Sequence, residues 1–188
     1  SIDAFSYQVP GDFSSAAFPL AAGIVTNSTT SLSTLDMQDA QGDKQLFLLL
    51  EKLGVNLSYN KEGKTFFLGE ESSLPGAVID VSCFIDALPI LAVLGCYAKS
   101  PWRIYNAKIA RKKESDRIHS ICTELKKMGA NIQEKESEIL VFPSKLKGAC
   151  LNSWHDHRIA MALIVAALGA EGASSLEAVE CIKKTYPY

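Results

Sequence analysis

An internal repeat constrains this chain more than any other feature of its sequence. An aspartate followed by an apolar, alanine-rich stretch occurs three times, at Asp12, Asp86 and Asp156, which are 74 and 70 residues apart. A second landmark agrees, because similar amphipathic segments end at Gly54 and at Gly129, 75 residues later. Self-similarity of this kind is typical of a fold that uses one supersecondary unit several times.

Each unit predicts the same order of elements, β-α-β-α-β-β. The aspartate is the expected N-cap of an apolar helix that is buried nearly all round. A strand, an amphipathic helix ending at a glycine, and two short strands follow. The second helices are expected over residues 44–53 and 116–128, and the strands over residues 29–35, 56–59, 65–68, 102–106, 131–134 and 139–142.

These elements predict an α/β (α+β) fold of three units. They cover about residues 11–70, 76–143 and 150–188, and the last unit is incomplete. Apolar helices should lie inside and sheets outside, and the helix N-termini converge if the units surround a pseudo-threefold axis. Residues 1–10 fall outside the repeat, and residues 5–9 are interpreted as a hinge strand that leads in from a preceding domain.

Composition argues against two classes of protein. The chain has 19 basic and 21 acidic residues, whereas a dedicated nucleic-acid binder normally shows a strong basic excess. It has no run of 18 apolar residues, so no membrane-spanning segment is expected. Its five cysteines include no CxxC pair, which favours reduced, mostly buried thiols in a cytosolic protein.

Residues 108–118 form the most polar segment, with five basic and two acidic side chains. One interpretation is a solvated helix start, with Ser115 or Asp116 as the N-cap. A second is a nucleic-acid patch, although no aromatic residues are interleaved. A third is an anion site in which Arg117 binds a carboxylate or phosphate and Glu114 is a general acid or base beside Lys113.

Two further candidates stand at the starts of apolar helices. His155 and His157 are two residues apart and do not share a helical face, so zinc is not expected there. An Asp156 cap with Arg158 facing an anion is the simpler interpretation. Asp86 is explained equally well as an N-cap or as a catalytic carboxylate. Converging helix N-termini would favour a polyanionic small ligand, and no standard nucleotide-binding motif is present.

Four motifs resemble, in the same order, those of the 3-phosphoshikimate 1-carboxyvinyltransferase (EPSP synthase) family. They are GDFSSAAF at residues 11–18, KESDRI at 113–118, DHRIAM at 156–161 and KTYP at 184–187. The resemblance implies the C-terminal domain of a cytoplasmic, monomeric, two-domain enzyme, with the active site between the domains. Residues 11–188 would then lack their N-terminal domain partner, and the chain is expected to fold but to be inactive alone.

The reaction implied by this resemblance transfers the enolpyruvyl group of phosphoenolpyruvate to the 5-hydroxyl of shikimate 3-phosphate. It releases phosphate and uses no metal or organic cofactor. By resemblance, Asp86 contacts the shikimate hydroxyls and is the base candidate, Glu114 is the acid candidate, and Lys184 lies close to both reactants. The remaining implied ligands are Arg117 and Arg158 for phosphoenolpyruvate and Lys113 for the 3-phosphate.

Two alternatives stay open from the sequence. One is the sister enzyme that transfers enolpyruvate to UDP-N-acetylglucosamine, and the other is a non-catalytic anion-binding module of the same fold. The chain also departs from the family pattern at Ile109 and His155, where some or many members carry asparagine. These departures leave substrate affinity and the response to glyphosate open.

Overall fold

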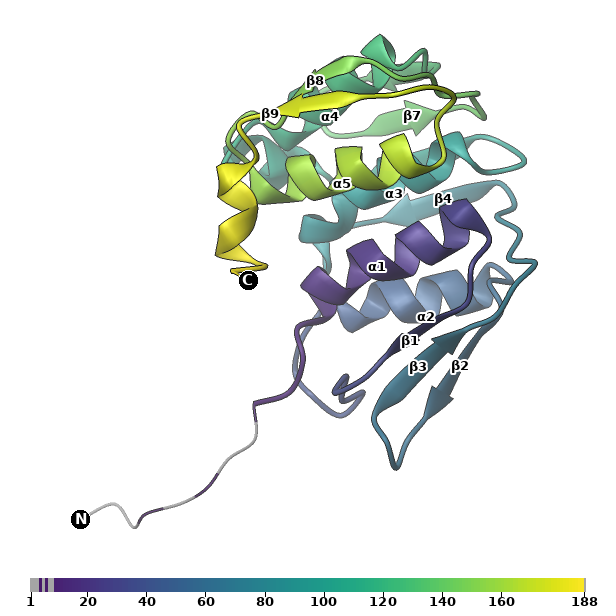
Figure 1. The fold of residues 1–188 in the computed structure, drawn as a ribbon, viewed down its shortest axis with the longest axis vertical. Helices are drawn as coiled ribbons and strands as arrows, with labels where there is room; N and C mark the ends of the chain where they lie inside the picture. The colour runs from purple at the N-terminus through teal and green to yellow at the C-terminus, as the bar shows by residue number, and fades with distance from the viewer. Residues whose placement is uncertain (1–3, 5, 7–8, 188) are drawn as a thin grey trace.

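The computed structural model describes residues 4, 6 and 9–187, and three successive units are visible in it (Figure 1). The first unit contains α1 (Phe13–Thr26), β1 (Thr30–Leu32), α2 (Lys44–Lys52), β2 (Leu57–Asn60) and β3 (Thr65–Leu68). The second contains β4 (Ala77–Asp80), η1 (Ile85–Ala87), α3 (Leu88–Cys96), β5 (Trp102–Tyr105), η2 (Lys108–Lys112), α4 (Arg117–Lys127), β6 (Ile132–Glu134) and β7 (Ile139–Val141). The third contains β8 (Cys150–Asn152), α5 (His157–Leu168), β9 (Ser175–Glu177) and η3 (Val179–Lys184).

Each unit carries its own small sheet. The strand orders are β1-β3-β2 in the first, β4-β5-β7-β6 in the second, and a parallel β8-β9 pair in the third. The second unit shows all six elements of the predicted β-α-β-α-β-β order, with β4 parallel to β5 and the other pairs antiparallel. The predicted α/β fold class is therefore confirmed. The hinge strand expected over residues 5–9 falls mostly outside the described residues.

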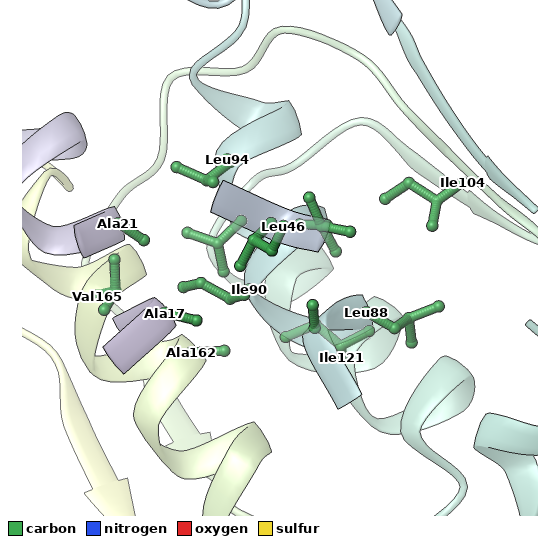
Figure 2. Close-up of a cluster of buried hydrophobic side chains, with 14 of the residues drawn as sticks. Ala17, Ala21, Leu46, Leu88, Ile90, Leu94, Ile104, Ile121, Ala162 and Val165 are labelled. Atoms are coloured by element: carbon green, nitrogen blue, oxygen red, sulfur yellow. The ribbon is translucent and has the colours of Figure 1, made fainter. Parts of the chain in front are cut away.

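The first helix of every unit lies at the centre of the molecule. α1, α3 and α5 all contact one another, and α2 and α4 pack outside them (Figure 1). Every residue of α3 is buried, which explains why its sequence shows no polar face. In Figure 2, Ile90 of α3 lies beside Ala17 of α1 and Ala162 of α5, so small side chains allow the three helices to approach closely.

The predicted N-caps are correct for two of the three central helices. Asp12 accepts hydrogen bonds from the backbone N–H groups of Ser14 and Ser15 at the start of α1. Asp156 accepts one from Arg158 N–H at the start of α5. The prediction that Asp86 caps the second central helix is wrong. Asp86 lies in η1, and the N-cap position of α3 is taken by the next residue, Ala87.

Glycines end both second helices, as predicted. Gly54 and Gly129 have φ values of +93° and +87°, in the left-handed region that side chains disfavour.

The expectation of mostly buried cysteines is wrong: of the five free thiols, only Cys96 and Cys122 are buried, while two are exposed and one is half-buried. No helix in the described part of the chain combines the length and hydropathy that a membrane crossing requires.

Candidate active site

Arg117, the first residue of α4, is the centre of a cluster of charged side chains. Only 1% of its side chain is exposed. Its Nε donates to Asp156 Oδ2 at 2.7 Å, and its terminal nitrogens donate to Asp86 Oδ1 at 2.7 Å and to Glu114 Oε2 at 2.5 Å. The planar guanidinium therefore binds three carboxylates from three separate segments, which compensates its burial.

Asp86 is surrounded by positive charge. Besides Arg117, Lys113 Nζ lies 3.1 Å from its Oδ1, and an Arg158 terminal nitrogen lies 3.2 Å from its Oδ2. Burial raises the pKa of Asp86, but Arg158, Arg117 and Lys113 outweigh it and hold the pKa below its ordinary value. Asp86 is therefore a carboxylate near neutral pH, able to accept a proton or a hydroxyl hydrogen bond.

Glu114 joins the cluster to the C-terminal segment. Lys184 Nζ, at the end of η3, donates to Glu114 Oε1 at 2.7 Å. Burial raises the pKa of Glu114, but the hydrogen bond from Lys184, a backbone N–H and the charge of Arg117 lower it to about 2. In this arrangement Glu114 is ionised at neutral pH, so it becomes a proton donor only when these partners are exchanged.

Arg158 connects the third unit to the first. Its guanidinium donates to Ser14 Oγ at 2.9 Å and approaches the Ser14 carbonyl oxygen at 3.5 Å. Ser14 also donates its hydroxyl hydrogen to Asp12, the N-cap of α1. The starts of α1 and α5 are thus linked directly, and Arg158 with Asp86 extends the link to the region before α3.

The structure brings together all six site residues predicted from the sequence. Direct contacts run from Lys184 through Glu114 and Arg117 to Asp86, where Lys113 and Arg158 also bind. Of the rest of the polar segment, Ser115 donates a hydrogen bond to Asp156 beside Arg117. Lys108 and Arg111 instead bind acidic groups of the β6–β7 hairpin, and Ile109 is 55% exposed. The nucleic-acid interpretation of this segment therefore has no support.

Three residues at the cluster were not recognised as parts of it from the sequence. Ser14 binds Arg158, and Asp156, beyond capping α5, binds Arg117 and accepts a hydrogen bond from Ser115. Asp43, before α2, makes no capping hydrogen bond, and its Oδ1 is buried without a described partner. Burial and the charge of Asp86 raise the pKa of Asp43. Only Asp156 carried a signal, its place beside Arg158.

Potential metal ligands are scattered in the described part of the chain. Among the described residues, no group of three or more histidine, cysteine, aspartate or glutamate side chains is arranged to hold an ion. His157 is almost buried and lies 3.9 Å from Asp156, and burial together with Arg158 lowers its pKa. The arrangement instead offers four cations and several carboxylates, which suits a ligand with phosphate or carboxylate groups and reactions that move protons.

Comparisons with known proteins identify a family for the chain. A protein-family model described as EPSP synthase (3-phosphoshikimate 1-carboxyvinyltransferase) matches residues 2–188. The 3-phosphoshikimate 1-carboxyvinyltransferase of Chlamydia caviae is 52% identical over 187 residues, which are 98% of this chain and 41% of that protein. That of Chlamydia trachomatis serovar D is 48% identical over 191 residues, covering 100% of this chain and 43% of the relative.

Solved structures give the same result. EPSP synthase from Acinetobacter baumannii matches 96% of this chain with a TM-score of 0.84 and 27% identity, over 44% of its own chain. The enolpyruvyl transferase NikO from Streptomyces tendae matches with a TM-score of 0.77 at 20% identity, which shows a likeness of fold alone. The chain spans about two fifths of the length of these relatives. It belongs to the EPSP synthase family.

Proposed function

We propose that this chain is the C-terminal half of an enzyme that transfers the enolpyruvyl group of phosphoenolpyruvate to the 5-hydroxyl of shikimate 3-phosphate. The observation that carries the proposal is the convergence of two carboxylates, Asp86 and Glu114, on one buried arginine within a cluster of cations. Proton transfers need carboxylates of this kind, and both substrates carry phosphate and a carboxylate that need cations.

Asp86 is the proposed base. The reaction adds the 5-hydroxyl oxygen to C2 of phosphoenolpyruvate while a proton is added to C3, which gives a tetrahedral intermediate. Loss of phosphate from C2 and of a proton from C3 then yields the product. The lowered pKa of Asp86 keeps it ionised and able to take the hydroxyl proton. Lys113, 3.1 Å from Asp86, is the proposed ligand of the 3-phosphate.

Glu114 and Lys184 are the proposed proton-transfer pair for C3. Their ion pair of 2.7 Å keeps Glu114 charged. A substrate phosphate or carboxylate that binds Lys184 would compete with Glu114, raise the pKa of Glu114 and make it a proton donor.

Arg158 and Arg117 are the proposed ligands of phosphoenolpyruvate. The side chain of Arg158 is 12% exposed and is the more accessible of the two, whereas Arg117 binds substrate only by exchanging a carboxylate partner.

The proposal includes a preceding domain, because the relatives are more than twice as long as this chain. That domain would supply the remaining ligands across a cleft, and the complete enzyme would be a monomer. All five cysteines are free thiols, including the exposed Cys83 and Cys150. Free thiols accord with the reducing cytoplasm.

The test is phosphate release by the complete two-domain enzyme. Phosphoenolpyruvate is supplied with shikimate 3-phosphate in one reaction and with UDP-N-acetylglucosamine in another. Release only with shikimate 3-phosphate supports the proposal, and Asp86→Asn should then lower kcat by roughly 100- to 10,000-fold, as expected for loss of a general base. Release only with the nucleotide sugar would assign the sister reaction, and no release from a folded enzyme would favour an anion-binding module.

A further inference from the structure

The loop before α5 has a backbone conformation that needs outside support. Trp154 and His155 have φ values of 56° and 54°, in the left-handed region that residues other than glycine rarely adopt. Consecutive residues of this kind persist only where surrounding contacts hold them. The loop ends at Asp156, which binds Arg117. Residues 152–156 are here called the 152–156 bend. The contacts that hold this bend therefore affect the charged cluster.

Glu124 of α4 supplies those contacts from outside the cluster. It is fully buried, and its Oε1 accepts a hydrogen bond from the indole Nε1 of Trp154 at 2.9 Å. Its Oε2 accepts one from the backbone N–H of Asn152 at 3.0 Å. Lys127 donates to both oxygens, at 2.9 and 2.8 Å. A buried carboxylate is costly unless it is paired, and here its pairing fixes the bend at two points.

The bend also has internal hydrogen bonds that depend on its shape. Trp154 N–H donates to Asn152 Oδ1 at 2.7 Å, and His155 N–H donates to Ser153 Oγ at 3.1 Å. The Ser153 hydroxyl donates in turn to the carbonyl oxygen of Ala178 at 2.8 Å. These contacts stabilise the bend locally, whereas Glu124, together with the His119 ring that lies edge-on to Trp154, connects its Asn152–Trp154 part to the helix that also carries Arg117.

Helix α4 holds both ends of the bend. Arg117 and Glu124 are seven residues apart, which is about two helical turns and roughly 10 Å along one face. Arg117 binds Asp156 at one end, and Glu124 binds Asn152 and Trp154 at the other. Because a helix is stiff, the spacing of these two side chains fixes where Asp156 stands relative to the arginine.

We propose that Glu124 is a positioning residue of the active site. By holding Asn152 and Trp154 it keeps the 152–156 bend in place, so that Asp156 orients Arg117. This inference rests on the proposed function for its catalytic consequence, since it takes Arg117 as a ligand of phosphoenolpyruvate. Loss of the contact frees the bend and the arginine, and it weakens phosphoenolpyruvate binding more than shikimate 3-phosphate binding, because Lys113 lies outside the bend.

The experiment compares three variants in the complete two-domain enzyme. Glu124→Gln removes the charge, and Trp154→Phe removes the indole N–H that reaches Glu124 while keeping a smaller aromatic ring. Glu138→Gln is the matched control, because Glu138 also pairs with a lysine three residues away but ties Arg103 of β5 to the β6–β7 hairpin, remote from the cluster. The readouts are the KM values for both substrates and the solvent-exchange rate of the Arg117 Nε–H in arginine-labelled protein.

The expected result is a rise of about ten-fold in KM for phosphoenolpyruvate in Glu124→Gln and in Trp154→Phe. The KM for shikimate 3-phosphate, and both KM values of the control, should change by less than two-fold. Arg117 Nε–H should exchange faster in Glu124→Gln and Trp154→Phe. Equal rises in both KM values, or a control that matches these two variants, would overturn the proposal. If Glu124→Gln does not fold, Trp154→Phe decides, and unchanged kinetics with unchanged exchange would overturn it.

The two proposals can fail separately. If the wild-type enzyme transfers no enolpyruvyl group, the proposed function fails. The exchange rate of Arg117 Nε–H in Trp154→Phe against Glu138→Gln still measures whether the bend orients the arginine. Faster exchange in the first variant alone then supports positioning by Glu124, and equal rates in the two variants overturn it.

Discussion

At the scale of single residues, the reactivity of the cluster depends on which carboxyl groups are paired. Burial raises the pKa of Asp86 and of Glu114, but nearby cations lower it more, so the pKa of each lies below its ordinary value. Asp43 is close enough to Asp86 to feel its charge, and with burial this raises the pKa of Asp43. The pKa values of carboxyl groups in one cluster are therefore shifted in opposite directions by their surroundings.

The pairing of Glu114 with Lys184 gives a testable pH dependence. Since the folded-state pKa of Glu114 is about 2 and its ordinary value is 4.5, the pair stabilises the fold above about pH 4.5 and loses this effect as the pH falls through 2. Lys184→Met should raise the pKa of Glu114 and lower the free energy of unfolding at pH 7 by at most about 1 kcal/mol, because the pair is partly exposed. Carboxyl NMR titration and urea unfolding measure both.

Lys183→Met is the control for this prediction, because it removes the neighbouring exposed lysine. The stability difference between wild type and Lys184→Met should shrink as the pH is lowered from 4.5 to 2, whereas the control should show no such trend. A Glu114 pKa that stays near 2 in Lys184→Met would show that Arg117 and the backbone N–H alone determine it.

The site was predictable at residue scale as far as its motifs extend. Arg117 and Arg158 could be identified because they lie in short polar runs at helix starts, and Lys184 because its motif resembles that of the family. Ser14 and Glu124 could not, since a serine in an apolar helix and a glutamate in an amphipathic one are ordinary at those positions. Their roles arise from contacts across 144 and 30 residues of chain, which no local pattern encodes.

At the scale of elements, local signals determine most helix boundaries. The glycine-terminated helices and the hairpins were predictable because left-handed caps and alternating strands are local features. The start of α3 was not, since Pro89 favours the first turn of a helix and moves the helix start beyond Asp86. The strand expected over residues 29–35 is also shorter, because only Thr30–Leu32 pairs with β3.

The two correct caps should differ in their sensitivity to charge. Asp12→Asn should change the free energy of unfolding by less than about 0.5 kcal/mol, because asparagine caps a helix as well as aspartate does. Asp156→Asn should cost roughly 3 kcal/mol, because Asp156 is fully buried against Arg117 and the variant leaves that charge less compensated. Urea unfolding of the two variants checks this, and equal losses would mean that Asp156 acts only as a cap.

A proline inside α1 creates a second element-scale prediction. Pro19 has no N–H, so the Ser15 carbonyl lacks its helical partner, and the Tyr186 hydroxyl donates to it at 2.8 Å. Tyr186→Phe should therefore cost about 1 kcal/mol of unfolding free energy. In a Pro19→Ala background the residue-19 N–H replaces the hydroxyl, so the same change should cost much less. Equal costs in both backgrounds, measured by urea unfolding, would contradict this account.

At the scale of the whole molecule, the three units are not independent. Their first helices share one core around α3, and the charged cluster takes Asp86 and Arg117 from the second unit and Arg158 and Lys184 from the third. Arg158 also reaches Ser14 of the first. The periodicity of the sequence predicted the units, but only packing shows that they share both a core and a cluster.

The 188-residue chain should therefore unfold in one cooperative transition and release no phosphate when it is supplied with phosphoenolpyruvate and shikimate 3-phosphate. The shared core couples the units, while the cluster supplies only one wall of the proposed cleft, so substrates bound to it stay open to water on the other side. Coincident urea transitions from far-UV and near-UV circular dichroism measure the first part, and a phosphate assay beside the two-domain enzyme measures the second. Separate transitions would mean that the units fold independently, and turnover by the chain alone would place the complete site on this half.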